Sequence, residues 1–172
     1  MNISDTDFQL FDVPARYEQD PAQLDARWKV LQREVHPDRF AAQGAAAQRV
    51  AMQWAVRVNE AYRRLKDPLA RSAYLCELNG RSVDAHSNTA MPAEFLMQQM
   101  AWREQLEEAS GLADVEALAD EVAEQQRRLH DDLRRSIDER QDWEGAAQRV
   151  RSLMFVARFA EDIDRRLDAL DA

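Results

Sequence analysis

Residues that make turns, cross-links and metal sites are scarce in this sequence. Among 172 residues there are four Gly, five Pro and a single Cys, Cys76. Because a β sandwich or barrel needs a turn after every short strand, so few turn residues exclude both folds. One cysteine excludes an internal disulfide framework and a cysteine-rich zinc or iron–sulfur site. The three histidines, His36, His86 and His130, stand far apart, so we expect neither a metal site nor a cofactor.

Long apolar runs and a surplus of positive charge are missing as well. No stretch approaches the roughly 18 consecutive apolar residues of a membrane-spanning helix. The acidic start of the chain, residues 1–7, lacks the basic residues and apolar run of a signal peptide. We therefore expect a cytoplasmic protein that makes no membrane contact. The formal net charge of −9 argues against binding nucleic acid, which needs an excess of Lys and Arg.

The charge that is present is unevenly distributed. Residues 1–80 contain 11 basic and 11 acidic side chains, whereas residues 81–172 contain 12 basic and 21 acidic ones. Between Arg27 and Arg71, ten basic residues face only four acidic ones. Two modules that meet different partners would explain this pattern, and so would ordinary solvated charge on helices.

Two long helices are predicted in the first half. Asp20 and Pro21 make a typical helix start, and Pro37 ends that helix near His36. Its apolar stripe is Leu24, Trp28, Leu31 and Val35. After a loop over residues 38–44, a second helix over 45–66 has its own stripe, which is Ala47, Val50, Trp54, Val58, Ala61 and Leu65. Facing stripes and a short connection predict an antiparallel hairpin, followed by a short third helix from Asp67-Pro68 to Asn79-Gly80.

The second half is predicted to be a three-helix antiparallel bundle. Residues 81–91 show no periodicity and are interpreted as a linker. One helix spans about 92–109, and the next carries Val115, Leu118, Val122, Leu129, Leu133 and Ile137. The last begins after the capping residue Asp142 and carries Val150, Leu153, Ala157, Ala160 and Leu167. The fold class is therefore all-α.

The helix over 92–109 has two apolar faces, although a helix needs only one to join a bundle. Phe95, Trp102 and Leu106 form the expected core side. The second face is Leu96, Met97, Met100 and Ala101, and Glu104 and Glu108 continue it. Because methionine adapts to the shape of its partner, this face suits client binding. The alternative is a central helix buried on both sides. Phe155 lies away from the stripe of its own helix and is expected to face solvent, where it could extend the second face.

The tripeptide His36-Pro37-Asp38 stands between the two long helices of the first half. Pro37 fixes the backbone, while His36 and Asp38 offer hydrogen-bond donors and acceptors. On the preceding helix, Lys29 and Arg33 fall opposite the apolar stripe and Arg27 lies on the flank. A basic face beside a rigid polar loop suits docking on an acidic surface.

Residues 8–75 resemble the J-domain of Hsp70 co-chaperones. The matching features are the hairpin with its His36-Pro37-Asp38 loop, Asn59-Glu60-Ala61-Tyr62, and Asp67-Pro68 followed by Arg71 and Tyr74. The resemblance implies a J-domain over residues 1–80 that stimulates ATP hydrolysis by an Hsp70 partner, so this chain is not itself an enzyme. It also implies an Hsp70-binding set, which is His36, Pro37, Asp38, Arg27, Lys29, Arg33 and Arg39.

Nearly the whole chain is similar to one kind of J-protein, the HscB-type co-chaperones of iron–sulfur cluster assembly. The local matches are residues 11–17, 31–34, 95–99 and 103–104. The resemblance implies that residues 92–172 bind an IscU-type scaffold protein, on which clusters are built, and deliver it to an HscA-type Hsp70. The implied scaffold-binding positions are Leu96, Met97, Met100, Ala101, Glu104, Glu108 and Phe155. Ala101 departs from the family, since related bacterial proteins usually have an acidic residue there.

Two other functions remain open at this point. The first is a general J-domain co-chaperone whose helical half binds a different client or forms dimers. The second is a structural helical protein in which the His36-Pro37-Asp38 loop is idle.

Overall fold

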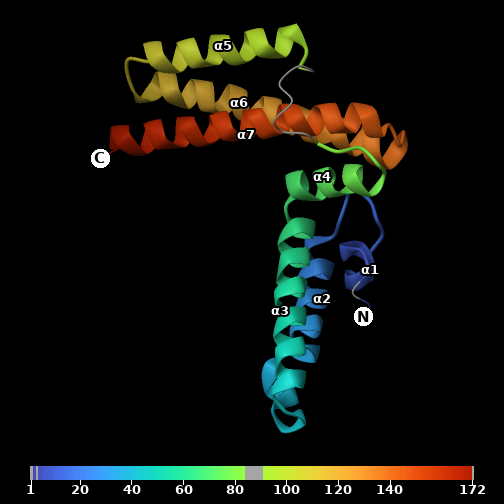
Figure 1. The fold of residues 1–172 in the computed structure, drawn as a ribbon. Coiled ribbons are helices and arrows are strands. Elements are labelled where there is room, and N and C mark those ends of the chain that lie inside the picture. The colour runs from blue at the N-terminus through green and yellow to red at the C-terminus, as the bar shows by residue number, and fades with distance from the viewer. Residues whose placement is uncertain (1, 3, 84–90, 172) are drawn as a thin grey trace. The chain divides into compact units, whose positions relative to one another are not determined.

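The computed structural model describes residues 2, 4–83 and 91–171, all in helices and connecting turns without a strand in those ranges (Figure 1). This confirms the predicted all-α class. The chain divides into two compact units, residues 1–75 and 76–172. The predicted linker over 81–91 falls for the most part outside the described residues.

The N-terminal unit is built around a helical hairpin. Its elements are α1 (Asp7–Phe11), α2 (Pro21–Glu34), the 3₁₀ helix η1 (Pro37–Gln43), α3 (Ala45–Lys66) and the start of α4 (Pro68–Leu78). In Figure 1, α2 and α3 run side by side in opposite directions. Helix α2 starts as predicted, because Asp20 Oδ1 accepts a hydrogen bond from the Ala22 amide at 2.9 Å and Pro21 occupies the first turn.

Apolar packing and polar contacts together fix how α2 lies on α3. Leu24 and Leu31 of α2 and its C-cap residue Val35 are buried, as are Val58, Ala61 and Leu65 of α3. The side-chain oxygen of Asn59 accepts hydrogen bonds from Trp28 Nε1 at 3.0 Å and from Gln32 Nε2 at 2.7 Å. Because these bonds form at only one alignment of the helices, Asn59 sets the register of the hairpin.

Helix α1 is joined to α3 through a buried acid. Thr6 caps α1, and the side chain of Asp7 is fully buried. Its carboxylate lies 2.6 Å from Arg57 Nη1 and 2.9 Å from Arg64 Nη1. Burial of a carboxylate is tolerated when it is paired in this way.

Two predictions about the N-terminal unit need correction. Residues 37–43 form η1 instead of an open loop, because the Arg39 amide donates to the His36 carbonyl at 3.0 Å and starts a tight turn. Val50 of the predicted stripe is 53% exposed, because this end of α3 faces η1, which covers it only partly.

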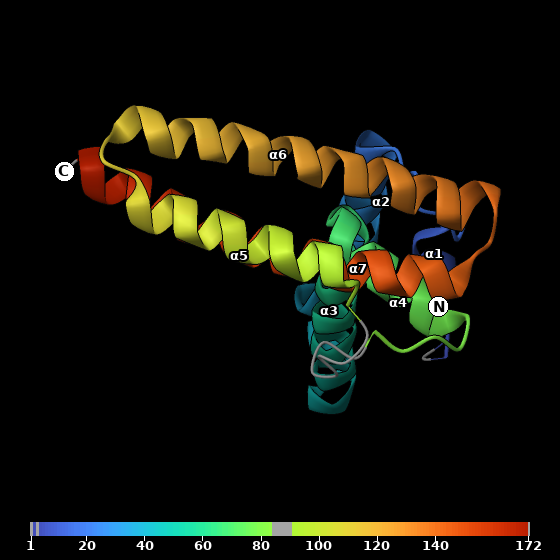
Figure 2. The same ribbon diagram turned by 90° about the horizontal axis from the view of Figure 1, so that it is seen from above.

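The C-terminal unit is the predicted three-helix antiparallel bundle. It contains α5 (Ala93–Glu108), α6 (Leu112–Arg134), the π-helical turn η3 (Arg135–Glu139) and α7 (Trp143–Asp171). The three helices lie along one another in both ribbon views (Figures 1 and 2). Asp142 caps α7, since its Oδ1 accepts from the Gly145 amide at 2.9 Å. All the predicted core residues of the second helix are buried, namely Val115, Leu118, Val122, Leu129, Leu133 and Ile137.

The predicted stripe of α7 is right at its beginning and wrong further on. Val150 and Leu153 are buried, but Ala157, Ala160 and Leu167 are only half-buried. Val156, Phe159 and Ile163 are buried instead. The reason is that α7 contacts both α5 and α6, so its buried surface is wider than a stripe that faces one neighbour.

Candidate partner-binding sites

The His36-Pro37-Asp38 loop follows α2, with His36 at the N-cap of η1 and Pro37 and Asp38 as the first residues of η1. The side chains of His36 and Asp38 are 56% and 90% exposed. His36 Nδ1 accepts a hydrogen bond from the Asp38 amide at 3.3 Å, which leaves the Nε2 hydrogen available to an outside acceptor. Since Pro37 fixes its own φ angle, the loop presents a donor from His36 and carboxylate acceptors from Asp38 in a defined arrangement.

Basic side chains line the solvent side of the helix before this loop. Lys29, Arg33 and Arg39 are exposed, and Arg27 is half-buried on the flank, as predicted. Arg33 Nε donates to the Lys29 carbonyl and Arg39 Nη1 donates to the Arg33 carbonyl, each at 3.2 Å. These bonds hold Arg33 and Arg39 near His36, and the three line one surface depression together with Gln32.

Two residues that sequence reasoning did not single out position this loop. Gln32 borders the depression and bonds Asn59, while Asn59 also bonds Trp28. Asn59 belongs to segment 59–62, which resembles the J-domain, but its hydrogen-bond partners lie about 30 positions earlier in the chain. No local periodicity predicts a bond of that span.

In the second candidate site, α5 turns an apolar face to solvent. Met97 and Met100 are 70% and 71% exposed, and Leu96 is 42% exposed. Ala101, Glu104 and Glu108 are exposed beside them. The core side is formed by the buried Trp102 and Gln99 with the half-buried Phe95 and Leu106. The alternative of a helix buried on both sides is therefore wrong.

The two flanks of α5 differ. Gln98 Nε2 and Trp102 Nε1 both donate to Glu121 of α6, so this flank faces α6. With a rotation of about 100° per residue, Leu96 and Met100 fall on the opposite flank. Met97, Ala101, Glu104 and Glu108 lie between the flanks, on the outermost side.

Phe155 of α7 is half-buried, so the expectation that it faces solvent is only partly right. Its neighbours one turn away on the same face both meet α5. Ser152 lines a cavity with Phe95, and the Phe159 ring stacks on Trp102 with centroids 5.8 Å apart. Phe155 therefore lies on the α5 side of α7, which explains why it is half-covered.

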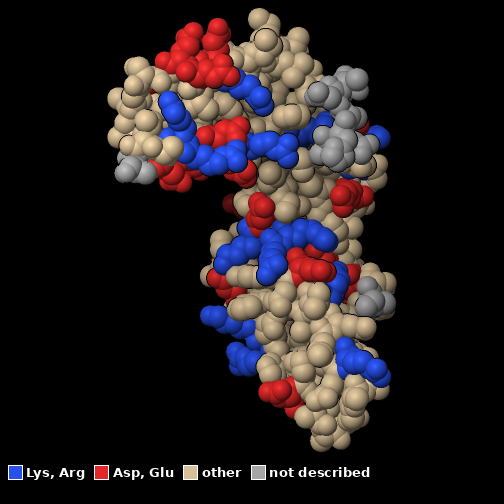
Figure 3. Space-filling view, turned by 60° about the vertical axis from the view of Figure 1, so that its left-hand side comes forward, with Lys and Arg blue, Asp and Glu red and all other residues tan. Residues whose placement is uncertain are grey.

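In Figure 3 a dense group of Asp and Glu side chains stands on the C-terminal unit beside a band of Lys and Arg, and both signs of charge also appear on the N-terminal unit. Residues 81–172 contain 21 acidic and 12 basic side chains, and Glu104 and Glu108 next to the apolar face contribute to this net negative charge. Such a charge favours approach of partners with a basic surface.

The described residues provide little for a bound metal. Within 2, 4–83 and 91–171, no group of three or more His, Cys, Asp or Glu side chains is placed to hold a metal ion. Cys76 is fully buried, and burial raises the pKa of its thiol to about 11. It behaves as a small apolar core residue, as predicted. None of the helices over those ranges is long and apolar enough to cross a membrane.

Comparison with known proteins assigns this arrangement to a family. Residues 91–164 match the family model described as the HSCB C-terminal oligomerisation domain. The chain is 45% identical over 174 residues to the co-chaperone protein HscB homolog of Burkholderia thailandensis, with 99% of each chain covered. It belongs to the HscB family of co-chaperones. This confirms the resemblance to J-type co-chaperones of iron–sulfur cluster assembly.

Solved structures of HscB proteins share the fold. The chaperone HscB from Vibrio cholerae is 33% identical with a TM-score of 0.84, and 96% of this chain and 99% of that chain are covered. The human co-chaperone protein HscB is 27% identical with a TM-score of 0.91, and the match covers 96% of this chain and 84% of the human one. These HscB relatives are named as chaperones or co-chaperones.

Proposed function

We propose that this HscB-family chain stimulates the ATPase of a specialised, HscA-type Hsp70 and delivers an IscU-type cluster scaffold to it, so that clusters pass on to maturing proteins. The observation that carries the proposal is the exposed His36-Pro37-Asp38 loop on a hairpin whose register is fixed by Asn59. Residues 1–80 act on the Hsp70, residues 92–172 bind the scaffold, and 81–91 link them. A cytoplasmic location stays a prediction.

On the Hsp70 side, His36 and Asp38 make the contact that triggers hydrolysis. Their side chains are exposed, and the bond from the Asp38 amide holds the imidazole ring so that its Nε2 hydrogen points away from the loop. Lys29, Arg33, Arg39 and the flanking Arg27 attract an acidic surface before that contact forms. Long-range attraction of this kind speeds association and depends on salt. ATP is bound and cleaved by the partner.

On the scaffold side, Leu96, Met97 and Met100 form the apolar centre of the interface. Exposed apolar side chains in one patch mark an interaction surface, and the thioethers adapt to the partner's shape. Phe155 borders this patch from α7, and Glu104 and Glu108 form its acidic edge. Ala101 adds no charge, so the interface has one fewer electrostatic contact than is usual in bacterial relatives.

A different role of the C-terminal unit is the second candidate function. The matching family model is described as an oligomerisation domain, and an exposed apolar face also suits contact between copies. In that case the chain is a J-domain co-chaperone whose C-terminal unit forms dimers or binds another client.

Calorimetric titration with the cluster scaffold, without the chaperone, tests the client. We expect micromolar binding or tighter, which is about −8 kcal/mol. Leu96→Ala should cost about 1–2 kcal/mol of binding, as interface anchors do. Leu112→Ala is the matched control, because Leu112 lies on α6 and is 40% exposed against 42% for Leu96. The absence of binding, confirmed by a second method, would favour the second candidate.

One further substitution, Phe155→Ala, extends this titration to α7. Phe155→Ala should also weaken scaffold binding by about 1–2 kcal/mol. Because Phe155 is half-buried, we expect it to lower the free energy of unfolding by a similar amount, whereas Leu96→Ala should leave stability almost unchanged. A loss of several kcal/mol of stability in Leu96→Ala would place that residue in the core.

An ATPase assay with the Hsp70 partner tests the loop. We expect His36→Gln to remove the stimulation while the helical content stays the same. Arg33→Gln should raise the concentration needed for half-maximal stimulation. Arg49→Gln removes an exposed charge on α3 outside the basic face and serves as its control. Full stimulation by the His36→Gln variant would show that the loop is idle.

A further inference from the structure

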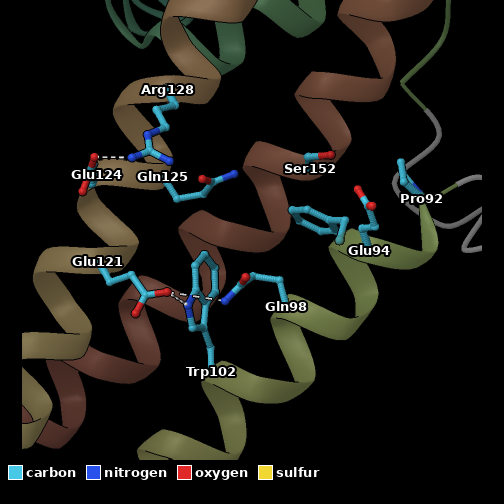
Figure 4. Close-up of a pocket in the computed structure, with 10 residues that line it drawn as sticks. Pro92, Glu94, Gln98, Trp102, Glu121, Glu124, Gln125, Arg128 and Ser152 are labelled. Atoms are coloured by element: carbon cyan, nitrogen blue, oxygen red, sulfur yellow. Dashed lines mark hydrogen bonds and ion pairs between the residues drawn. The ribbon is translucent and has the colours of Figure 1, made fainter.

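A groove between α5 and α6 shares only Glu108 with the scaffold-binding face proposed above. A cavity of about 450 Å³ lies in it, with Ser152 of α7 on its wall (Figure 4). The side chains of Phe95, Gln98 and Trp102 line it from α5, and those of Glu121, Glu124 and Arg128 line it from α6. A second cavity of about 380 Å³ shares Glu121 and continues past Gln105 and Asp114 to Glu108. We call the two cavities together the acidic groove.

The carboxylate of Glu121 is held in place from inside the bundle. Trp102 Nε1 donates to Glu121 Oε1 at 2.7 Å, and Gln98 Nε2 donates to the same oxygen at 3.4 Å (Figure 4). Trp102 is only 1% exposed and stacks on Phe159, so its indole cannot turn away. Over the ranges that the structure describes, no donor pairs with the other oxygen, Oε2. The groove therefore contains a fixed acceptor with one oxygen available.

Negative charge exceeds positive charge along the whole groove. In the first cavity Arg128 is paired with Glu124, which leaves the carboxylates of Glu94 and Glu121 uncompensated. The second cavity is lined by Glu108 and Asp114 with no basic side chain among its described lining residues. Hydrogen bonds from the Ser110 hydroxyl and amide lower the pKa of Asp114, so it stays ionised.

The occupant that fits is an organic cation and not a metal ion. Over residues 2, 4–83 and 91–171, no group of three carboxylates comes close enough for a metal. The first cavity also has an aromatic lining residue besides Trp102, because the half-buried Phe95 side chain lines it together with Glu121. A guanidinium group is planar and weakly hydrated, so it can stack on an aromatic ring and bond a carboxylate at the same time.

We propose that the acidic groove binds an arginine-bearing segment of a protein partner, with one guanidinium between Phe95 and Glu121. The second cavity continues the row of carboxylates, which suits a peptide that extends beyond a single side chain. The site lies on the flank of α5 opposite Leu96 and Met100 and meets the scaffold face only at Glu108. It is therefore a second contact of the C-terminal unit, separate from delivery of the scaffold.

The test uses the full chain and a synthetic dodecapeptide of alternating Ala and Arg, with an Ala and Glu peptide of equal length as control. The readout is the NMR signal of the Trp102 indole N–H, which bonds Glu121. We expect a saturable shift with the arginine peptide alone. N-acetylarginine amide should shift the signal in the same direction, but only at a much higher concentration.

Glu121→Gln keeps an acceptor for Trp102 and removes the charge. It should weaken peptide binding by about ten-fold, as expected for loss of a charge-assisted bond. Glu116→Gln is the control, since Glu116 is exposed on the opposite side of α6, and it should have less than a two-fold effect. An unmoved Trp102 signal, or equal effects of the two variants or of the two peptides, would overturn the proposal. A shift that grows with protein concentration without peptide, and disappears in Glu121→Gln, would overturn it in favour of a second copy.

Discussion

In the N-terminal unit the helices are joined by polar side chains as well as by a core, whereas in the C-terminal unit α6 and α7 are joined by apolar side chains along most of their length. Asp7, Asn59 and Asp25 each bond residues of another segment of the N-terminal unit. Hydrogen bonds between helices require a narrow range of distances and angles, whereas apolar contacts tolerate small shifts of one helix along another. The first arrangement therefore suits a loop that must be presented in a fixed geometry.

The C-terminal unit solves a different problem. Helix α5 contributes only Gln99 and Trp102 to the fully buried set, while α6 contributes five residues. A weakly buried helix can keep Leu96, Met97 and Met100 in solvent without losing its place in the bundle. The comparison shows that the N-terminal unit uses polar side chains to fix the positions of its helices. The C-terminal unit instead leaves one face of α5 exposed for contact with a partner.

Among the substitutions that test this comparison, removal of the Trp102 side chain should have the largest effect on stability. We expect Trp102→Ala to lower the free energy of unfolding of the C-terminal unit by about 3–5 kcal/mol, because a large buried ring is lost. Hydrogen exchange of the α5 amides should accelerate first. Leu106→Ala, at a half-buried position of α5, is the control with a smaller loss. If Trp102→Ala and Leu106→Ala lowered the free energy of unfolding equally, the packing of α5 would not depend on Trp102 alone.

The substitution Asp7→Asn tests the ion pairs that join α1 to α3 in the N-terminal unit. The change leaves Arg57 and Arg64 without their buried counter-charge, and we expect a loss of about 1–3 kcal/mol in urea unfolding, because both guanidinium groups are partly exposed and solvent screens their charge. Asp12→Asn is the matched control, because Asp12 is exposed and has a left-handed backbone that Asn accepts. Equal stability of the two variants would mean that α1 is held by apolar contacts alone.

The smallest effect concerns pH and the partly exposed cluster of Asp25, Tyr62 and Lys66. The hydrogen bond from Lys66, and then that from Tyr62, lowers the pKa of Asp25 below its ordinary 3.8. The bond to Asp25, and then that to Tyr62, raises the pKa of Lys66 above 10.5. The cluster therefore stabilises the fold between these limits, and its contribution disappears as pH falls below 3.8 or rises above 10.5.

Urea midpoints measured across that range check the cluster. Wild type and Asp25→Asn should differ slightly at pH 7, and the difference should shrink as pH falls below 3.8. Added salt should also reduce it, because both charged groups are partly exposed. A difference that persists unchanged at pH 3 would assign the effect to packing and not to charge.

Much of this fold could be predicted from the sequence, because helices leave local signals. The bounds of α3 agree with the prediction at both ends, and the caps Asp20 and Asp142 act as predicted. The exposed face of α5 was predictable for the same reason, since a second apolar stripe at helical spacing indicates either a helix buried on both sides or an exposed binding face. The His36-Pro37-Asp38 loop was recognised because it stands between two helices that each have an apolar stripe.

The parts that were not predictable depend on distant residues. The buried position of Asp7 requires Arg57 and Arg64, and no pattern near Asp7 indicates them. The wide buried surface of α7 and the half-buried state of Phe155 follow from contact with two helices at once, whereas periodicity describes one stripe at a time. The acidic groove likewise needs Trp102 and Glu121 to meet across α5 and α6.

The attachment of α1 also has a consequence for synthesis of the chain. Asp7 Oδ2 accepts a hydrogen bond from Arg64, 57 positions later, and the Asp7 amide donates to the Tyr74 hydroxyl, 67 positions later. At about 5–20 residues per second, roughly 3–13 seconds pass between translation of Asp7 and translation of those partners. During that time the first helix to be made cannot complete its contacts, and the apolar side chains of Phe8 and Phe11 stay unpacked. The N-terminal unit therefore closes only when its last helix has emerged.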